Sequence, residues 1–209
     1  MSSRQSGRLL TLFNLNTYFS APRVVPLYIN YMQIFIETER LFIRELLPTD
    51  DTGMFELDAD PEVHRYLGNT PVKTIEQSRE TIAMVRQQYL DNGIGRWAMV
   101  EKATGNFMGW TGFKLIRDTV NNHTDFYDLG YRIIRRYWGK GYATESAIAC
   151  RDYGFRQLDQ PTLYAMTNVE NKNSKKVLEK VGFICKETFL NKDLPHFWFE
   201  VNREANKKY

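Results

Sequence analysis

The stretch RRYWGKGYATES (residues 135–146) places three cationic side chains and two glycines directly before residues with helical character. Glycine permits tight turns and lets a ligand approach the backbone closely. The first N–H groups of a helix have no partner inside the helix and carry positive dipole potential. The stretch therefore predicts an anion-binding turn suited to a phosphate or pyrophosphate. The alternative is a glycine-rich connection that holds no ligand.

Two familiar phosphate-binding motifs do not fit this stretch. The Walker pattern needs a glycine, four further residues, Gly-Lys and then Ser or Thr, and the sequence contains no such string. The dinucleotide-binding pattern needs a third glycine where Thr144 stands, and it follows the first strand of a chain. ATP and NAD are therefore weaker candidates for the anion.

The rest of the chain shows strand and helix patterns in the order of a mixed α/β protein. Predicted strands cover residues 33–46, 96–101, 107–116, 124–134, 162–168, 183–190 and 196–201. Start and stop signals such as Asp60 before Pro61 predict helices. The first predicted helix begins at Thr49 or Asp50, and the second covers residues 60–67. The third begins at the Thr74–Gln77 capping box and ends at the sequence DNG (91–93). The last two cover residues 142–157 and 171–181.

Composition excludes several classes of protein. The chain has 209 residues with 43% hydrophobic and 25% charged residues, the range of a soluble globular domain. A net charge of +3 is too small to indicate a nucleic-acid partner, and no apolar run is long enough to predict a membrane span. Two cysteines without ligand-like spacing favour a reduced, cytoplasmic setting, and no cluster of ligand residues predicts a metal.

The first 31 residues differ from the rest, since they contain no Asp or Glu. An organelle transit segment has a similar composition. We favour a segment outside the fold, either an extension upstream of a natural start at Met32 or a remnant of cloning. A single domain is expected over residues 32–209.

The pattern Arg136-x-x-Gly139-x-Gly141 resembles the pyrophosphate signature of the GCN5-related N-acetyltransferase (GNAT) superfamily. The resemblance extends to IETERLFIREL (36–46), to DLGYRI (128–133) and to NVENKNSKKVLEKVGF (168–183), and it covers residues 33–200. Within the superfamily the chain is most similar to the enzymes that acetylate alanine or serine at the N-termini of ribosomal proteins.

The resemblance implies a fold, a donor and a set of binding residues. The fold is a twisted, mostly antiparallel mixed sheet of about seven strands flanked by helices, with a V-shaped opening between the fourth strand (124–134) and the fifth (162–168). The donor is acetyl-CoA. Its binding residues are expected to be Ile133, Ile134, Arg135, Arg136, Gly139, Lys140, Gly141, Tyr142, Ala143, Thr144, Asn171 and Ser174.

Acetyl transfer to an amine needs a neutral amine, donors for the oxyanion and a stabilised thiolate. An α-amine of pKa about 7.8 costs about 1 kcal/mol to deprotonate at pH about 7, whereas a lysine costs about 4.6 kcal/mol. An α-amine therefore needs only a weak base, and Asp128 on the fourth strand is the candidate. The alternative for Asp128 is a solvated carboxylate at a strand end. The resemblance places the oxyanion donors near Ile133.

The proton donor for the thiolate is less evident. Many members of the superfamily carry a tyrosine seven residues after the Asn that begins the last helix, and Leu178 stands there. Asn171, Ser174 and Leu178 share one helical face. We predict that Asn171 bonds the pantetheine arm and that Ser174 assists protonation of the sulfur. The alternative, of equal weight, is that Ser174 has no catalytic role and is a polar helix residue whose hydroxyl bonds a backbone carbonyl.

These observations predict an N-acetyltransferase that works by direct attack of a primary amine on acetyl-CoA in a ternary complex. A protein N-terminus, an amino acid, a polyamine or an antibiotic remains open as acceptor, and a non-catalytic CoA-binding regulatory domain is the alternative. Acceptor-side residues are expected in the segments 66–72, 117–126 and 191–196. An exposed edge strand at the C-terminus can pair between two copies of the chain and so predicts a homodimer.

Overall fold

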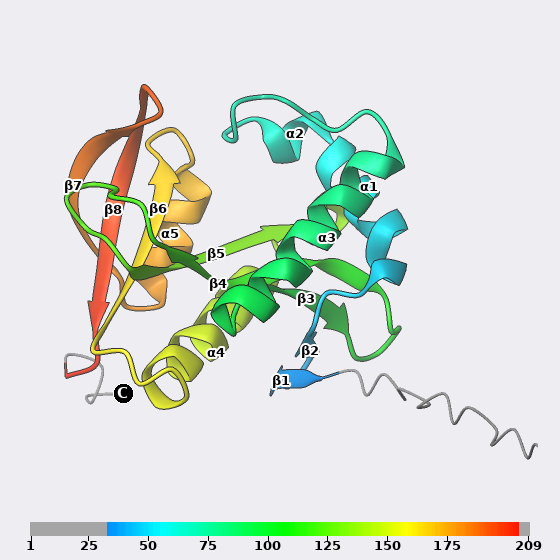
Figure 1. Ribbon diagram of the computed structural model, residues 1–209, viewed down its shortest axis with the longest axis horizontal. Helices are drawn as coiled ribbons and strands as arrows, with labels where there is room; N and C mark the ends of the chain where they lie inside the picture. Colours follow the sequence, from blue (N-terminus) through cyan, green and yellow to red (C-terminus); the bar gives the residue numbers. More distant parts are fainter. Residues whose placement is uncertain (1–32, 205–209) are drawn as a thin grey trace, which may run out of the picture. The chain divides into compact units, whose positions relative to one another are not determined.

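The sheet of the computed structural model, which describes residues 33–204, has eight strands in the order β1-β2-β3-β4-β5-β6-β8-β7 (Figure 1). Every neighbouring pair is antiparallel except β5 and β6, which run parallel. The predicted mixed, mostly antiparallel sheet is confirmed, with one more strand than expected. The strands are β1 Ile34–Glu37, β2 Leu41–Arg44, β3 Arg96–Glu101, β4 Phe107–Ile116, β5 Phe126–Ile133, β6 Thr162–Asn168, β7 Ile184–Asn191 and β8 Leu194–Asn202.

The extra strand arises because the single strand predicted over residues 33–46 is wrong. This segment forms β1 and β2, which pair antiparallel. A tight turn separates them, in which the Thr38 N–H donates to the Leu41 carbonyl at 3.0 Å and the Leu41 N–H donates to Thr38 Oγ1 at 3.0 Å. The four polar residues 37–40 and the shift of the apolar residues from even positions (34 and 36) to odd positions (41 and 43) mark the turn, and the prediction of a single strand overlooked both signals.

The helices begin and end close to where their capping signals predict. Gln77 caps α3 from its third position, and Gly93 ends that helix with φ of 68°. Asp60 accepts a bond from the Glu62 N–H at the start of α2, which stops well short of the predicted residue 67. The helices are α1 Asp51–Ala59, α2 Pro61–His64, α3 Ile75–Asn92, α4 Tyr142–Arg156 and α5 Lys172–Lys180, with 3-10 turns at Pro48–Asp50 and Arg135–Tyr137.

Strand register shows which helices cover each face of the sheet. Thr111 on β4 contacts Cys150 of α4, with Oγ1 and Sγ 3.6 Å apart. Side chains alternate between faces, so the neighbouring Trp110 and its cross-strand partner Arg132 lie on the opposite face. There Arg132 pairs with Asp58 of α1. Hence α4 packs on one face and α1 on the other, with α3 beside α1 (Figure 1).

The close packing of α4 on the sheet depends on small side chains. Ala147 and Cys150 are fully buried, and Gly154 is buried with them. A Cβ at Gly154 would lie 2.8 Å from atoms of Leu163 and Phe113. A face of small residues therefore packs α4 on the sheet. It fixes the start of α4 against the sheet.

The predicted V-shaped opening lies between β5 and β6. These strands share one paired position, Asp128 with Tyr164, and diverge beyond it (Figure 1). Divergence leaves the second half of β5 without a neighbouring strand on that side. The family expectation of an opening between the fourth and fifth predicted strands is confirmed, since β5 and β6 are those strands.

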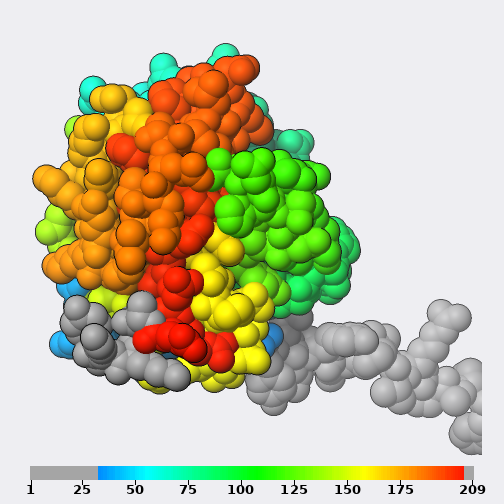
Figure 2. Space-filling model, turned by 90° about the vertical axis from the view of Figure 1, so that its left-hand side faces the viewer, coloured from blue at the N-terminus to red at the C-terminus, as the bar shows by residue number. Residues whose placement is uncertain are grey.

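The strand β7 forms one edge of the sheet. Figure 2 views the molecule from this side and shows the β7–β8 segment in orange and red at the surface, with the green β4–β5 loop against it. In that contact the rings of His123 and Trp198 lie 4.8 Å apart. Homodimer formation through this edge stays a prediction.

The predicted extension over residues 1–31 lies outside the described residues. Among the residues that the structure describes, no helix is long and apolar enough to cross a membrane.

Candidate active site

The predicted anion-binding turn lies between the end of β5 and the start of α4. Gly139 and Gly141 adopt φ of 73° and 84°, a left-handed conformation that residues with a side chain rarely take. Gly141 is the N-cap residue of α4, so the first N–H groups of that helix open onto the turn. The backbone therefore requires glycine at both positions, and the turn presents unpaired donors at the positive end of a helix.

The residues predicted to bind the cofactor surround this turn. Ile133 and Ile134 are buried at the end of β5 and anchor it. In α4, Tyr142 is buried, whereas Ala143 and Thr144 are half-buried. The exposed residues are Arg135, Arg136, Gly139, Lys140 and Gly141, which include all three cations of the stretch. One of these cations, Arg136, forms an ion pair with Glu56 of α1.

Glu145 in the first turn of α4 holds the turn in place. Its carboxylate accepts hydrogen bonds from Thr38 Oγ1 at 2.6 Å, from the Arg40 N–H at 3.0 Å and from Arg40 Nε at 2.7 Å. Arg40 Nη1 also donates to the Lys140 carbonyl at 3.0 Å. Burial favours protonation of Glu145, but these bonds outweigh it and hold its pKa below the ordinary value. The β1–β2 turn thus fixes both the helix start and the glycine loop.

The second predicted group of site residues lies at the start of α5. The Asn171 side chain accepts a bond from the Ser174 N–H at 3.1 Å and is the N-cap of this helix. Leu178 is buried with 2% exposure, so α5 presents no polar group there. Sequence reasoning missed Tyr131 of β5, whose hydroxyl lies 3.1 Å from Ser174 Oγ and 3.1 Å from the Ser174 carbonyl oxygen.

Asp128 lies on the other face of the sheet. Register places it with Trp110 and Arg132 on the α1 face, whereas Tyr131 shares the α4 face with Thr111. Its carboxylate is buried and pairs with Arg96 Nη2 at 2.5 Å. Burial raises the pKa of Asp128, and the Arg96 guanidinium opposes that effect. The structure therefore separates the two predicted catalytic residues, Asp128 and Ser174, across the sheet.

A second ion pair extends this polar cluster toward α1. Arg132 Nη1 donates to Asp58 Oδ1 at 2.5 Å. Both arginines also lie against the Trp110 ring: the guanidinium carbon of Arg96 is 5.2 Å from the ring centre and that of Arg132 is 5.0 Å from it. His64 of α2 lies beside Asp58, with Nε2 3.5 Å from Oδ1. Burial and the nearby Arg132 lower the pKa of His64. The cluster carries balanced charge, because each guanidinium has its own carboxylate.

The Arg96–Asp128 pair had one signal in the sequence. Gly112 and Gly130 lie opposite each other in the middle of β4 and β5, and a Cβ at Gly130 would lie 2.8 Å from Arg96 Nη2. Glycine inside a strand marks the close approach of another group. The partner itself was not predictable, since Arg96 and Asp128 are 32 residues apart in the chain.

Four aromatic residues on the strands β3, β4 and β5 fall into two groups by burial. Trp97 and Phe126 are buried in the core with 1% and 4% exposure, whereas Trp110 and Tyr127 are half-buried. Of the predicted acceptor-side segments, 117–126 packs on β8 through His123. The segment 66–72 follows α2, and 191–196 covers the end of β7, the β7–β8 turn and the start of β8.

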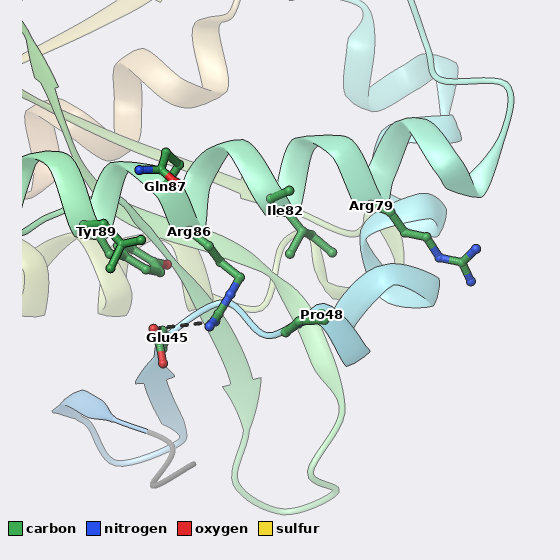
Figure 3. A pocket seen from close by; sticks show the side chains of 9 residues that line it. Glu45, Pro48, Arg79, Ile82, Arg86, Gln87 and Tyr89 are labelled. Carbon is green, nitrogen blue, oxygen red and sulfur yellow. Dashed lines mark ion pairs between the residues drawn. The ribbon is translucent and has the colours of Figure 1, made fainter. Parts of the chain in front are cut away.

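A separate hollow of about 520 Å³ lies between α3 and the segment that follows β2 (Figure 3). Arg86 and Glu45 form an ion pair across it, with Nη1 and Oε1 3.5 Å apart. Its other lining residues are Pro48, Arg79, Ile82, Ala83, Gln87, Tyr89 and Leu90. None of them is a predicted site residue.

A family model described as an acetyltransferase (GNAT) domain matches residues 40–184. Among curated proteins, the chain is 33% identical over 146 residues to "Uncharacterized N-acetyltransferase p20" of Bacillus licheniformis, which covers 70% of this chain and 80% of that protein.

Similar solved structures include enzymes named for different acceptors. A ribosomal-protein-S5-alanine acetyltransferase from Vibrio fischeri has a TM-score of 0.65 at 17% identity, covering 82% of this chain and 98% of that one. A spermidine N-acetyltransferase from Vibrio cholerae, in complex with CoA and spermine, has a TM-score of 0.63 at 18% identity, covering 80% and 98%. At sequence identities of 17% and 18%, the similarity shows a shared fold and does not extend to the acceptor.

Proposed function

Because the chain belongs to the GNAT acetyltransferase family and is an N-acetyltransferase, we propose that it transfers the acetyl group of acetyl-CoA to an α-amine. The proposed acceptor is a protein or peptide N-terminus, and the amine attacks directly within a ternary complex. The structural observation that supports acetyl-CoA as the acetyl donor is the turn before α4. Its left-handed glycines, open helix N–H groups and exposed cations suit a pyrophosphate.

The turn leaves room for such a ligand. A Cβ built at Gly139 would meet no atom within 4 Å, so the backbone of this residue is open to an approaching phosphate. Arg135, Arg136 and Lys140 are exposed around it, and although Arg136 pairs with Glu56, the three side chains together leave net positive charge at the turn. These features support Gly139 and Gly141 as the centre of the proposed CoA site.

The opening between β5 and β6 supports Ile133 as the oxyanion donor. The Ile134 N–H donates to the Met108 carbonyl of β4 at 2.9 Å. In an antiparallel ladder, neighbouring residues direct their N–H groups to opposite sides. The Ile133 N–H is therefore directed away from β4, toward the opening where β6 has already diverged. Bound acetyl-CoA supplies a thioester, and this N–H is the proposed donor to the oxyanion that its carbonyl forms.

Two further residues have proposed roles on opposite faces. Ser174 lies on the α4 face and is the proposed hydrogen-bond donor to the leaving sulfur, with Asn171 beside it for the pantetheine arm. Asp128 lies on the α1 face and is the proposed general base for the amine. Its raised pKa supports this role, because a carboxylate that binds protons more readily is a better base. An α-amine suits such a weak base better than a lysine does.

Charge on the α1 face supports an acceptor with one amine. The carboxylates Asp128 and Asp58 are each paired with an arginine, Arg96 and Arg132. A polyamine would be expected to meet unpaired carboxylates, and within residues 33–204 this cluster offers none. An N-terminal α-amine therefore remains the proposed acceptor.

We further propose a cytoplasmic setting, in keeping with the free thiols of Cys150 and Cys185.

The donor proposal is tested by calorimetry with acetyl-CoA on two glycine variants. Gly139 and Gly105 both have φ of 73° and both have open space at the Cβ position. An alanine at either site carries the same backbone strain, but only Gly139 lies in the proposed site. We expect Gly139→Ala to weaken acetyl-CoA binding about tenfold or more and Gly105→Ala to leave it unchanged. Equal affinities for the two variants, or no binding to the wild type, would refute the proposal.

A further inference from the structure

Tyr131 contacts Ser174 in the part of the sheet where β5 has lost its neighbour. The last paired position between β5 and β6 is Asp128, three residues before Tyr131. From there the phenol reaches α5, with its oxygen 3.1 Å from Ser174 Oγ and 3.1 Å from the Ser174 carbonyl oxygen. A strand residue thus supplies a hydroxyl beside the helix whose own position 178 holds a buried leucine.

The phenol is a strong hydrogen-bond donor but a weak acid in this position. Burial raises the pKa of Tyr131 to about 12, and the Ser174 contact only partly opposes that effect. A thiol has a reference pKa of about 8.5, so a thiolate does not remove a proton from this phenol to any large extent. Tyr131 therefore stays protonated through the pH range in which the enzyme would work.

Two hydroxyl protons are shared among three oxygen atoms. In one arrangement Tyr131 donates to the Ser174 carbonyl, and the Ser174 hydroxyl donates back to the phenol oxygen. In the other, Tyr131 donates to Ser174 Oγ, and the Ser174 proton is free to point away from the phenol. Both arrangements are compatible with the observed distances, and rotation about two C–O bonds converts one into the other.

We propose that Tyr131 is a positioning residue that directs the Ser174 hydroxyl proton toward the thioester sulfur. This inference rests on the proposed function. The amine nitrogen forms its bond to the carbonyl carbon and the carbonyl electron pair moves to the oxygen; when the carbonyl re-forms, the C–S bond breaks and its electron pair goes to sulfur. The Ser174 O–H then donates a hydrogen bond to that thiolate while Oγ accepts from Tyr131. No proton leaves either residue, and the proton released by nitrogen goes to the base or to water.

The first test reads the thiol of bound CoA and needs no acceptor amine. Thiolate absorbance near the ultraviolet edge is titrated for CoA bound to the wild type, Tyr131→Phe, Ser174→Ala and the double variant. We expect each single variant to raise the bound thiol pKa by about one unit, a tenfold loss of thiolate, and the double variant to raise it no further. Tyr153→Phe is the control, since Tyr153 packs on Trp97 away from Ser174.

The inference is overturned if Tyr131→Phe leaves the thiol pKa at the wild-type value or if the two single effects add. The second test compares turnover against pH. A positioning role predicts about tenfold lower turnover for Tyr131→Phe with a profile parallel to that of the wild type. A profile whose basic limb disappears in Tyr131→Phe would instead make Tyr131 a true acid and refute the proposal.

These outcomes separate the two claims. If no amine is acetylated but the thiol pKa shifts as expected, the proposed acceptor fails and the Tyr131 inference stands. If amines are acetylated and the pKa does not respond to Tyr131→Phe, the proposed function stands and the inference fails. Absence of CoA binding to the wild type refutes both.

Discussion

The ion pair between Arg96 and Asp128 allows a sharp prediction, because its stability cost can be worked from the structure. The side chains are 13% and 12% exposed, so both charges lie largely out of water. Removing one partner of a buried pair costs about 3–5 kcal/mol, since the other charge is left uncompensated. In Asp128→Ala, Arg96 Nη1 would still donate to the Asp128 and Gly112 carbonyls. We therefore expect the lower end of that range, about 3 kcal/mol.

The assay is equilibrium urea unfolding, with the stability change read at constant m-value. The double variant Arg96→Met, Asp128→Ala removes both charges and should recover much of the loss. The control is Glu62→Ala, which breaks the exposed Arg65 pair and should cost roughly 0–1 kcal/mol. A loss below about 1 kcal/mol for Asp128→Ala, or a double variant no more stable than the single one, would refute the reasoning.

Three further predictions concern the turn, a buried histidine and a buried cysteine. Glu145→Gln should raise the calorimetric Kd for acetyl-CoA about tenfold, because Arg40 loses its charged partner; an unchanged Kd would contradict this. The folded pKa of His64 is lowered, so the unfolded chain binds the proton first and stability falls as pH drops below about 6.5. His64→Gln should flatten that slope in unfolding curves between about pH 7 and 5, and an identical slope would count against it. Cys150→Ala should keep turnover, because burial raises the pKa of this thiol to about 12 and holds it away from ligands; loss of activity in folded protein would contradict direct attack.

Local signals in the sequence predicted most of the architecture. Gly139, Gly141 and the start of α4 follow from backbone chemistry that neighbouring residues specify, and the capping box of α3 is equally local. The β1–β2 turn was missed, although the four polar residues 37–40 and the shift of the apolar residues from even to odd positions mark it. Short-range chemistry is readable from sequence, and this turn was overlooked because the prediction relied on apolar alternation and not on the polar residues that interrupt it.

The site was harder to predict where it depends on contacts between distant segments. Asp128 was named as a candidate base, but its Arg96 partner comes from another strand. Tyr131 was not named, although the absent tyrosine at position 178 was noted, because only the fold brings β5 and α5 together. Strand alternation alone places Asp128 and Tyr131 on opposite faces, because they lie three residues apart in one strand. The sequence pattern does not say which helix covers each face, because that depends on contacts between distant segments.

The central claim is that this chain acetylates an α-amine with acetyl-CoA bound at the turn before α4. The most direct measurement is release of free thiol from acetyl-CoA across a panel of N-terminal peptides, free amino acids, polyamines and aminoglycosides, with wild type, Gly139→Ala and Gly105→Ala. The account predicts thiol release with N-terminal peptides, reduced in Gly139→Ala and preserved in Gly105→Ala. Release with polyamines or aminoglycosides alone, or equal activity in the two glycine variants, would contradict it.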